Sequence, residues 1–112
     1  MIDYKEGEVY DKKYIVVHLK QGRDLMVSYA SAHYHSDAFF KFSQLNPKVE
    51  GEVRGGGIVR IDPKTRTLRT YGTSGGYGDP DIDVVRRMME EYAESHFPGW
   101  KLEVTVTGYI RD

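Results

Sequence analysis

The residues best suited to chemistry in this chain begin with Tyr34-His35-Ser36-Asp37, a stretch whose pattern predicts the entry into a helix. The first N–H groups of a helix lack backbone partners and attract anions such as phosphate. The positive end of the helix dipole also disfavours an imidazolium ion, so His35 could stay neutral and act as a base. The alternative is that His35 is only a polar residue of the capping region.

A second candidate stretch is the glycine-rich segment Tyr71-Gly72-Thr73-Ser74-Gly75-Gly76-Tyr77-Gly78. Glycines allow successive N–H groups to turn inward and form a nest that binds an anion. The Ser74 hydroxyl could donate a hydrogen bond to a phosphate oxygen. The lysine and hydroxyl residue that follow the glycines of a P-loop are absent, and the dinucleotide-binding fingerprint is absent too. An ordinary flexible loop is therefore the alternative interpretation.

Positive charge for a phosphate group would come from basic residues on the predicted strands. Lys13 opens the first predicted strand, and four arginines flank the glycine triplet at residues 55–57 and the hairpin that follows it. Such charges are common on solvated strand faces, and a phosphate site requires one or two of them to point at it.

The four histidines do not predict a metal site. His18 lies inside a predicted strand, and His96 lies near the end of a predicted helix, where it complements the dipole. His33 and His35 would point the same way in an extended segment, but no third ligand completes a set. The chain has no cysteine, which excludes a disulfide, a thiolate metal site and a cysteine nucleophile. We therefore expect neither a metal nor another cofactor.

Length and composition narrow the class of protein. A chain of 112 residues fits one domain, taken as residues 1–112, with a modest core. The net charge of −1 gives no electrostatic case for binding nucleic acid or a membrane surface. No apolar run approaches the ~20 residues that cross a bilayer, and the polar first residues do not resemble a signal peptide. We expect a cytoplasmic monomer.

Hydrophobic periodicity and turn residues predict two strands, a helix, three strands, a helix and a strand. The first helix, residues 36–44, has Ser36 or His35 at its cap. The second helix begins with Asp79 as its cap and Pro80 at the first helical position. The predicted strands span residues 13–19, 25–29, 49–54, 58–61, 67–71 and 100–107.

These elements pack most economically as one mixed sheet of about six strands between two α-helices, which is an α/β fold. The apolar run at residues 13–19 is typical of a strand that is covered on both faces. Residues 58–71 predict a hairpin with a turn at Asp62-Pro63. Crossovers through the helices would permit parallel neighbours in the sheet.

Taken together, these stretches resemble the janus/ocnus family of small phosphohistidine phosphatases. The resemblance covers about residues 12–109 and implies a mixed sheet between two helices. It also implies a metal-independent phosphatase that acts on phosphohistidine in proteins. The matching features are Tyr34-His35-Ser36-Asp37, the glycine triplet at 55–57, the spacing Tyr71-Gly72-x-Ser74-x-x-Tyr77-Gly78, and the ending Gly108-Tyr109.

The resemblance assigns roles to five residues. His35 matches the family's catalytic histidine, and Lys13 matches a lysine that binds the substrate phosphate. Ser74 and Gly76 match loop positions that contact phosphate. Ser36 matches a residue whose backbone N–H contacts phosphate.

The chain departs from this resemblance at two positions. Two arginines of the better-studied animal members are replaced here by Val27 and Ile58. Arg60 lies two residues beyond Ile58 and therefore faces the same side of its strand. We expect Arg60 to be the candidate that supplies the missing charge.

The resemblance leads to one functional hypothesis and one rival. The chain would hydrolyse the P–N bond of phosphohistidine, with phospholysine as a second substrate and His35 as general base or nucleophile. The substrate would be a phosphohistidine-containing protein or a small phosphoramidate. The rival, favoured by the missing arginines, is a phosphate-binding or phosphoprotein-binding module without turnover.

Overall fold

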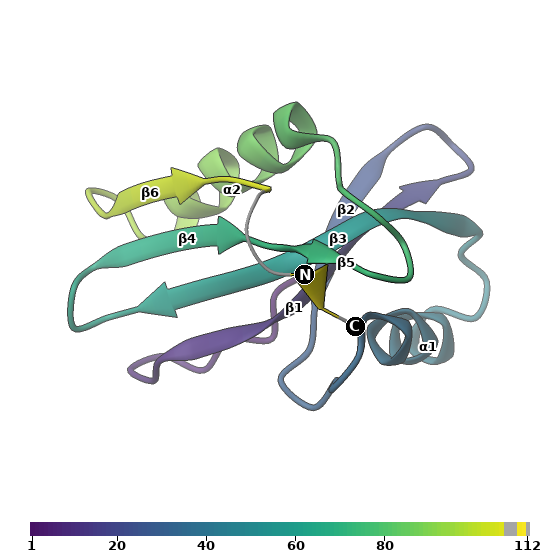
Figure 1. The fold of residues 1–112 in the computed structure, drawn as a ribbon, viewed down its shortest axis with the longest axis horizontal. Coiled ribbons are helices and arrows are strands. Elements are labelled where there is room, and N and C mark those ends of the chain that lie inside the picture. Colours follow the sequence, from purple (N-terminus) through teal and green to yellow (C-terminus); the bar gives the residue numbers. More distant parts are fainter. Residues whose placement is uncertain (107–109, 112) are drawn as a thin grey trace.

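One mixed sheet dominates the computed structural model, which describes residues 1–106 and 110–111 (Figure 1). Its five strands follow the order β2-β1-β3-β4-β6, and the short strands β5 and β7 pair separately. In chain order the elements are β1 (Tyr10–Leu19), β2 (Asp24–Ser28), α1 (His35–Leu45), β3 (Gly51–Asp62), β4 (Thr67–Tyr71), β5 (Thr73–Ser74), α2 (Ile82–His96), β6 (Lys101–Val104) and β7 (Ile110–Arg111).

Strand β1 organises the sheet because it pairs on both sides. It is antiparallel to β2 and to β3, with Ile15 opposite Val27 on one side and Gly56 on the other. Strands β3 and β4 form the predicted hairpin, in which Ile58 pairs with Tyr71. Strand β6 then runs parallel to β4, since α2 carries the chain back across the sheet.

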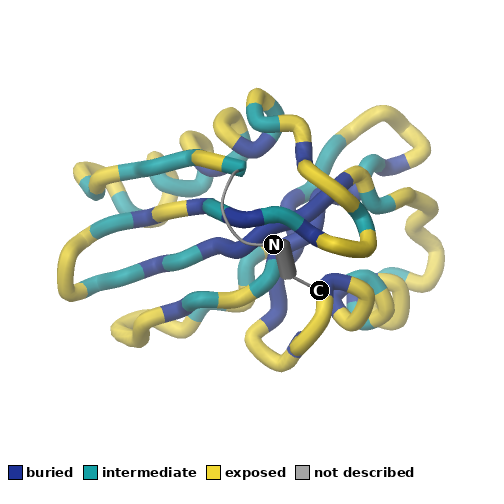
Figure 2. The backbone as a smooth tube through the Cα atoms, viewed as in Figure 1, coloured by how far each residue is buried: buried dark blue, intermediate teal, exposed yellow. Residues whose placement is uncertain are grey.

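The two helices cover opposite faces of the sheet, and the predicted α/β class is confirmed (Figure 1). Side chains alternate along β1, so Tyr14 and Val16 pack in the same cluster as α2, whereas Ile15 and Val17 pack with α1. All four of these side chains are buried, and the central parts of β1 and β3 form the buried middle of the molecule (Figure 2). The prediction of a strand covered on both faces is confirmed.

The prediction of about six strands was slightly wrong because the glycine triplet does not interrupt strand β3. Residues 49–54 and 58–61 were expected to be separate strands, yet β3 runs continuously from Gly51 to Asp62. Gly55 adopts a φ of 94°, which a residue with a side chain rarely adopts, and this keeps the strand extended across an irregular register with β1. The sheet therefore has five strands.

Helix α1 begins one residue earlier than predicted. Its cap is Tyr34, so His35 is the first helical residue and Ser36 the second. The Asp37 carboxylate accepts a hydrogen bond from the Tyr34 N–H at 3.0 Å, which fixes the turn that leads into the helix. The carboxylate also lies at the positive end of the helix dipole, as expected.

The Gly108-Tyr109 ending and residue 107 of the predicted last strand lie outside the described residues. Among residues 1–106 and 110–111, no helix is long and apolar enough to cross a membrane.

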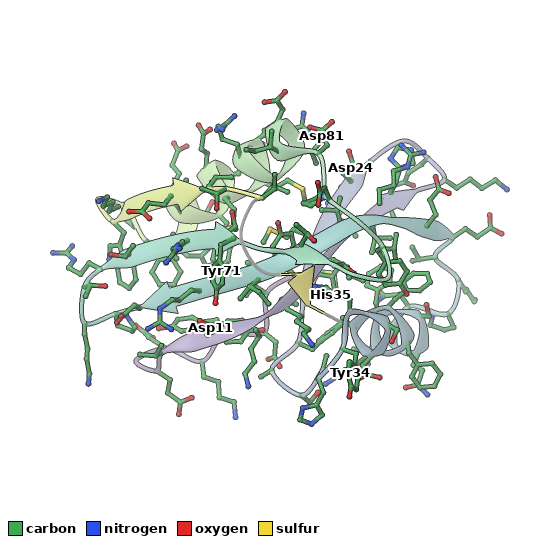
Figure 3. The ribbon with its side chains drawn as sticks, viewed as in Figure 1. Asp11, Asp24, Tyr34, His35, Tyr71 and Asp81 are labelled. Atoms are coloured by element: carbon green, nitrogen blue, oxygen red, sulfur yellow. The ribbon has the colours of Figure 1, made fainter. Side chains whose placement is uncertain are left out.

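The cap of α2 differs from the predicted one. The Asp81 carboxylate accepts hydrogen bonds from Asp83 N–H at 2.9 Å and Val84 N–H at 3.4 Å (Figure 3). Asp79 and Pro80 precede the helix, and their backbone lies directly against Gly55 of β3. Close packing on the strand therefore holds this dipeptide outside the helix, and the cap falls two residues later.

Replacing Asp81 with alanine should lower the free energy of unfolding by about 1 kcal/mol, since two helix N–H groups lose their acceptor. Urea denaturation measures this loss. Asp79→Ala is the matched control, because it removes the same charge two residues earlier without removing the cap. Equal losses in the two variants would contradict the assignment of the cap.

The raised pKa values of two tyrosines predict that the folded state is less stable in alkali. Burial raises the pKa of Tyr10 to about 12, and burial likewise raises the pKa of Tyr92 to about 12. An unfolded phenol loses its proton near pH ~10, so the folded state holds these protons more tightly between the two values. The free energy of unfolding should therefore fall as the pH rises from about 10 toward 12. Urea titrations at pH 8 and 11 would contradict this if they gave equal stability.

Candidate functional site

A cavity of about 470 Å³ lies where the beginning of α1 meets the loop after β5. These two segments are far apart in the sequence, and the packing of both against β3 brings them together (Figure 1). The residues that line the cavity are Tyr34, His35, Ser36, Ser74, Gly76 and Tyr77.

His35 is held against the strand beneath it. Its Nε2 lies 2.8 Å from the Gly57 carbonyl oxygen, and only 1% of the residue is exposed (Figure 3). A carbonyl oxygen can only accept a hydrogen bond, so Nε2 must carry the proton in this contact. In the neutral ring the lone pair is then on Nδ1, the nitrogen of an imidazole that accepts a proton or attacks an electrophile, and this atom is itself buried in the structure.

The glycine triplet gives the His35 ring its position. A Cβ atom at Gly56 would lie 2.8 Å from Cδ2 of His35 and 2.6 Å from the Tyr14 carbonyl oxygen. A Cβ atom at Gly57 would lie 2.9 Å from the Tyr14 ring and from the carbonyl oxygens of Gly72 and Tyr71. Real Cβ atoms essentially never lie this close to other atoms, so only glycine allows the ring and the backbone to pack this tightly.

Ser74 faces the same cavity from a compact turn. Its hydroxyl oxygen accepts a hydrogen bond from Tyr77 N–H at 3.0 Å, and its carbonyl oxygen accepts one from Gly78 N–H at 2.8 Å. Gly78 also accepts a hydrogen bond from Gly56 N–H at 3.2 Å, which ties the turn to β3. Ser74 is buried, and a hydroxyl that accepts one hydrogen bond can also donate its own proton to another acceptor.

The amide groups of the first turn of α1 add further donors. Ser36 is the second residue of the helix and lines the cavity beside His35. Amides at this position have no acceptor within the helix, and the helix dipole favours negative charge there. The cavity therefore combines an imidazole, a hydroxyl and a helix N-terminus, a combination suited to an oxyanion.

Lys13 lies at the edge of the cavity and does not line it. Its ammonium donates a hydrogen bond to the His33 carbonyl oxygen and lies 4.9 Å from the centre of the Tyr34 ring. Tyr34 in turn lines the cavity. Lys13 thus contacts Tyr34, which forms one wall of the cavity.

Arg60 lies apart from the other predicted site residues. Its guanidinium donates to Asp11 Oδ2 at 3.0 Å and lies 3.6 Å from Asp62 Oδ2. Arg60 is absent from the residues that line the cavity, and its charge is balanced by two carboxylates. The structure therefore gives no contact by which Arg60 would supply the charge of the missing arginines.

Four predicted residues thus meet in one cavity, and sequence reasoning missed three others that shape it. Tyr34 and Tyr77 form part of the lining, and Gly57 orients the imidazole. Both tyrosines stood inside the quoted motifs, so their position beside His35 and the glycine loop was the available signal. Over the described ranges, no group of three or more His, Asp or Glu side chains could hold a metal ion.

Comparison with known proteins places this geometry in context. The family model described as the Janus/Ocnus family matches residues 4–101, which include every residue of the cavity lining. The sex-regulated protein janus-A of Drosophila melanogaster is 25% identical over 103 residues, which are 87% of this chain and 73% of that protein. The janus-A proteins of Drosophila simulans and Drosophila mauritiana show the same identity and coverage.

The hydrogen bond to Gly57 predicts the tautomer of His35. In ¹⁵N NMR spectra of the neutral rings, Nε2 of His35 should be protonated and Nδ1 should not. His96 provides the contrast, since its Nδ1 faces the Tyr92 carbonyl oxygen at 3.2 Å and should carry the proton. The signals are assigned with His35→Gln and His96→Gln. A protonated Nδ1 on neutral His35 would contradict the proposed orientation of the ring.

Proposed function

The chain belongs to the Janus/Ocnus family, and we propose that it is a metal-independent phosphatase that hydrolyses the P–N bond of phosphohistidine in proteins. The observation that supports this most directly is the convergence of His35, Ser36 and Ser74 on one cavity. These residues come from a helix entry and a distant glycine-rich turn, and each offers a group that a phosphoryl transfer requires.

The phosphoryl group would bind with its oxygens toward the donors of the cavity. The Ser36 N–H, the Ser74 hydroxyl and the backbone at Gly76 would donate to these oxygens, as the helix N-terminus and the turn provide. The Lys13 ammonium lies 4.9 Å from the centre of the Tyr34 ring, and from this edge of the cavity it would stabilise the negative charge of the phosphoryl group. Fixed donors of this kind stabilise charge in the transition state without reorganising.

His35 would then drive the chemical step. With Nε2–H donating to Gly57, Nδ1 would take a proton from water as the water oxygen attacks phosphorus. The P–N bond breaks, the leaving nitrogen takes up a proton, and the products are inorganic phosphate and the free histidine side chain. In the covalent alternative, Nδ1 attacks phosphorus itself, and water hydrolyses the phosphorylated His35 afterwards.

A phosphate-binding module without turnover is the second candidate function. One observation favours it, since none of the six lining residues carries a positive charge. The buried position of His35 would then serve the packing of α1 on β3, and the cavity would hold a phosphoryl group through neutral donors only.

Replacing His35 with alanine should reduce phosphate release from a histidine-phosphorylated peptide on the order of 10²–10⁴-fold, because the general base or nucleophile is lost. The assay contains excess chelator, and circular dichroism verifies that the variant is folded. His96→Ala is the matched control, as this exposed histidine lies on α2. Full activity of the folded His35→Ala protein would remove His35 from the mechanism.

The same assay distinguishes the two candidate functions. Tight binding of the phosphorylated peptide by the unaltered protein, without any phosphate release, would favour the binding module. Where turnover occurs, single-turnover reactions quenched in alkali separate the two routes. A phosphorylated His35 detected by mass spectrometry identifies the covalent one, and its absence throughout the time course identifies the general-base one.

A further inference from the structure

The candidate cavity has room for an organic group besides a phosphoryl group. Its volume of about 470 Å³ lies in the range that holds small organic ligands in proteins. The donors proposed for the phosphoryl oxygens come from Ser36, Ser74 and Gly76, and His35 acts in the chemical step. The two lining residues that remain, Tyr34 and Tyr77, are both aromatic. The rest of the lining therefore favours a ligand with a planar ring.

None of the six lining residues carries a positive charge, and this bears on the charge of the group that the cavity holds. A phosphoryl group with three free oxygens carries about two negative charges at pH 7. An ester bond on one of those oxygens leaves a single negative charge. Removing charge from water without a cation beside it is costly, so the neutral donors suit the singly charged ester better. Arg60 and Arg69 do not change this, because both pair with carboxylates and neither lines the cavity.

Tyr34 offers a surface on which a planar ring can stack. Tyr34 and His35 lie together at the start of α1 (Figure 3). Although Tyr34 lines the cavity, 56% of the residue is exposed, whereas Tyr77 packs against the buried cluster beneath α1. Nucleotide bases of every kind stack on aromatic side chains, because each base has a π-face. An exposed tyrosine beside donors for phosphate oxygens is thus suited to a nucleoside that is joined to the phosphorus.

We propose that this cavity also hydrolyses the P–N bond of phosphoramidate monoesters, in which a nucleoside is esterified to the phosphorus and its base stacks on Tyr34. This inference rests on the proposed function, because it uses the same chemistry of His35, and it adds a substrate class. The water oxygen bonds to phosphorus while Nδ1 of His35 takes the water proton, and the P–N bond breaks. The leaving nitrogen takes up a proton from solvent, and His35 returns its own proton to solvent. The products are a nucleoside 5′-monophosphate and the free amine or imidazole.

The test compares three N-phosphorylated imidazoles, so that the leaving group is the same in each. One is unesterified, one is the 5-ester of 1-O-methylribose, and one is the 5′-ester of adenosine. Each kcat/KM is divided by the rate of the uncatalysed hydrolysis, which removes differences in intrinsic reactivity. The adenosine ester should exceed the ribose ester about tenfold, as stacking of one base provides. The ribose ester should exceed the unesterified compound, because it carries one charge fewer. Equal values for the two esters, or the highest value for the unesterified compound, would overturn the proposal.

Matched variants test the role of the aromatic ring. Tyr34→Leu should bring the ratio of the adenosine ester to the ribose ester close to one, whereas Tyr34→Phe, which keeps the ring, should preserve the ratio. Phe40→Leu removes an exposed aromatic ring of α1 that does not line the cavity, and it should also preserve the ratio. Circular dichroism verifies that each variant is folded. A folded Tyr34→Leu protein that keeps the tenfold preference would contradict the stacking of the base.

The inference and the proposed function fail in different ways. Hydrolysis of the unesterified compound and of a histidine-phosphorylated peptide, without hydrolysis of either ester, overturns the inference and leaves the proposed function intact. Hydrolysis of the esters alone, with the preference for adenosine that Tyr34→Leu abolishes, supports the inference and overturns the proposed substrate. Absence of hydrolysis of all four compounds overturns both.

Discussion

The contact between the His35 imidazole and the side-chain-free backbone of β3 is the constraint on which the candidate site depends. Gly56 leaves room for the ring, and the Gly57 carbonyl oxygen fixes which nitrogen carries the proton. The adjacent Gly55 lies against the Asp79–Pro80 backbone and lets the chain enter α2 at close range. One short run of glycines therefore sets the position of the imidazole on one side and of the α2 entry on the other.

Charged side chains are distributed unevenly around the cavity that His35, Ser36 and Ser74 line. Arg60 of β3 forms an ion pair with Asp11, and Arg69 of β4 forms one with Glu103. The Lys13 ammonium is instead held beside the candidate site by the His33 carbonyl oxygen and the Tyr34 ring. Local packing at the start of α1 thus fixes this ammonium beside Tyr34, whereas the carboxylate-paired arginines Arg60 and Arg69 do not line the cavity.

The sequence supported much of the fold, and its failures have physical causes. The continuous apolar run at residues 13–19 predicted a strand buried on both faces, since consecutive side chains of a strand point to opposite faces of the sheet. The glycine triplet was predicted to separate two strands, because local propensity does not indicate that the His35 ring of another element packs against Gly56. The α2 cap was misplaced for the same reason, as Asp79 and Asp81 differ only in what packs against them. Likewise, Arg60 shares a strand side with Ile58, but spacing gave no information about Asp11 on the neighbouring strand.

The pairing of β1 with β3 has a consequence for folding kinetics. Tyr10 pairs with Ile61 and Leu19 with Gly51, so this central ladder joins segments with strand β2 and helix α1 between them. Bringing such distant segments together costs loop-closure entropy before their native contacts form, so this pairing is a slow step in folding. Since His35 rests on the very strand that this step adds to the sheet, the cavity beside the start of α1 can arise only after the ladder has closed.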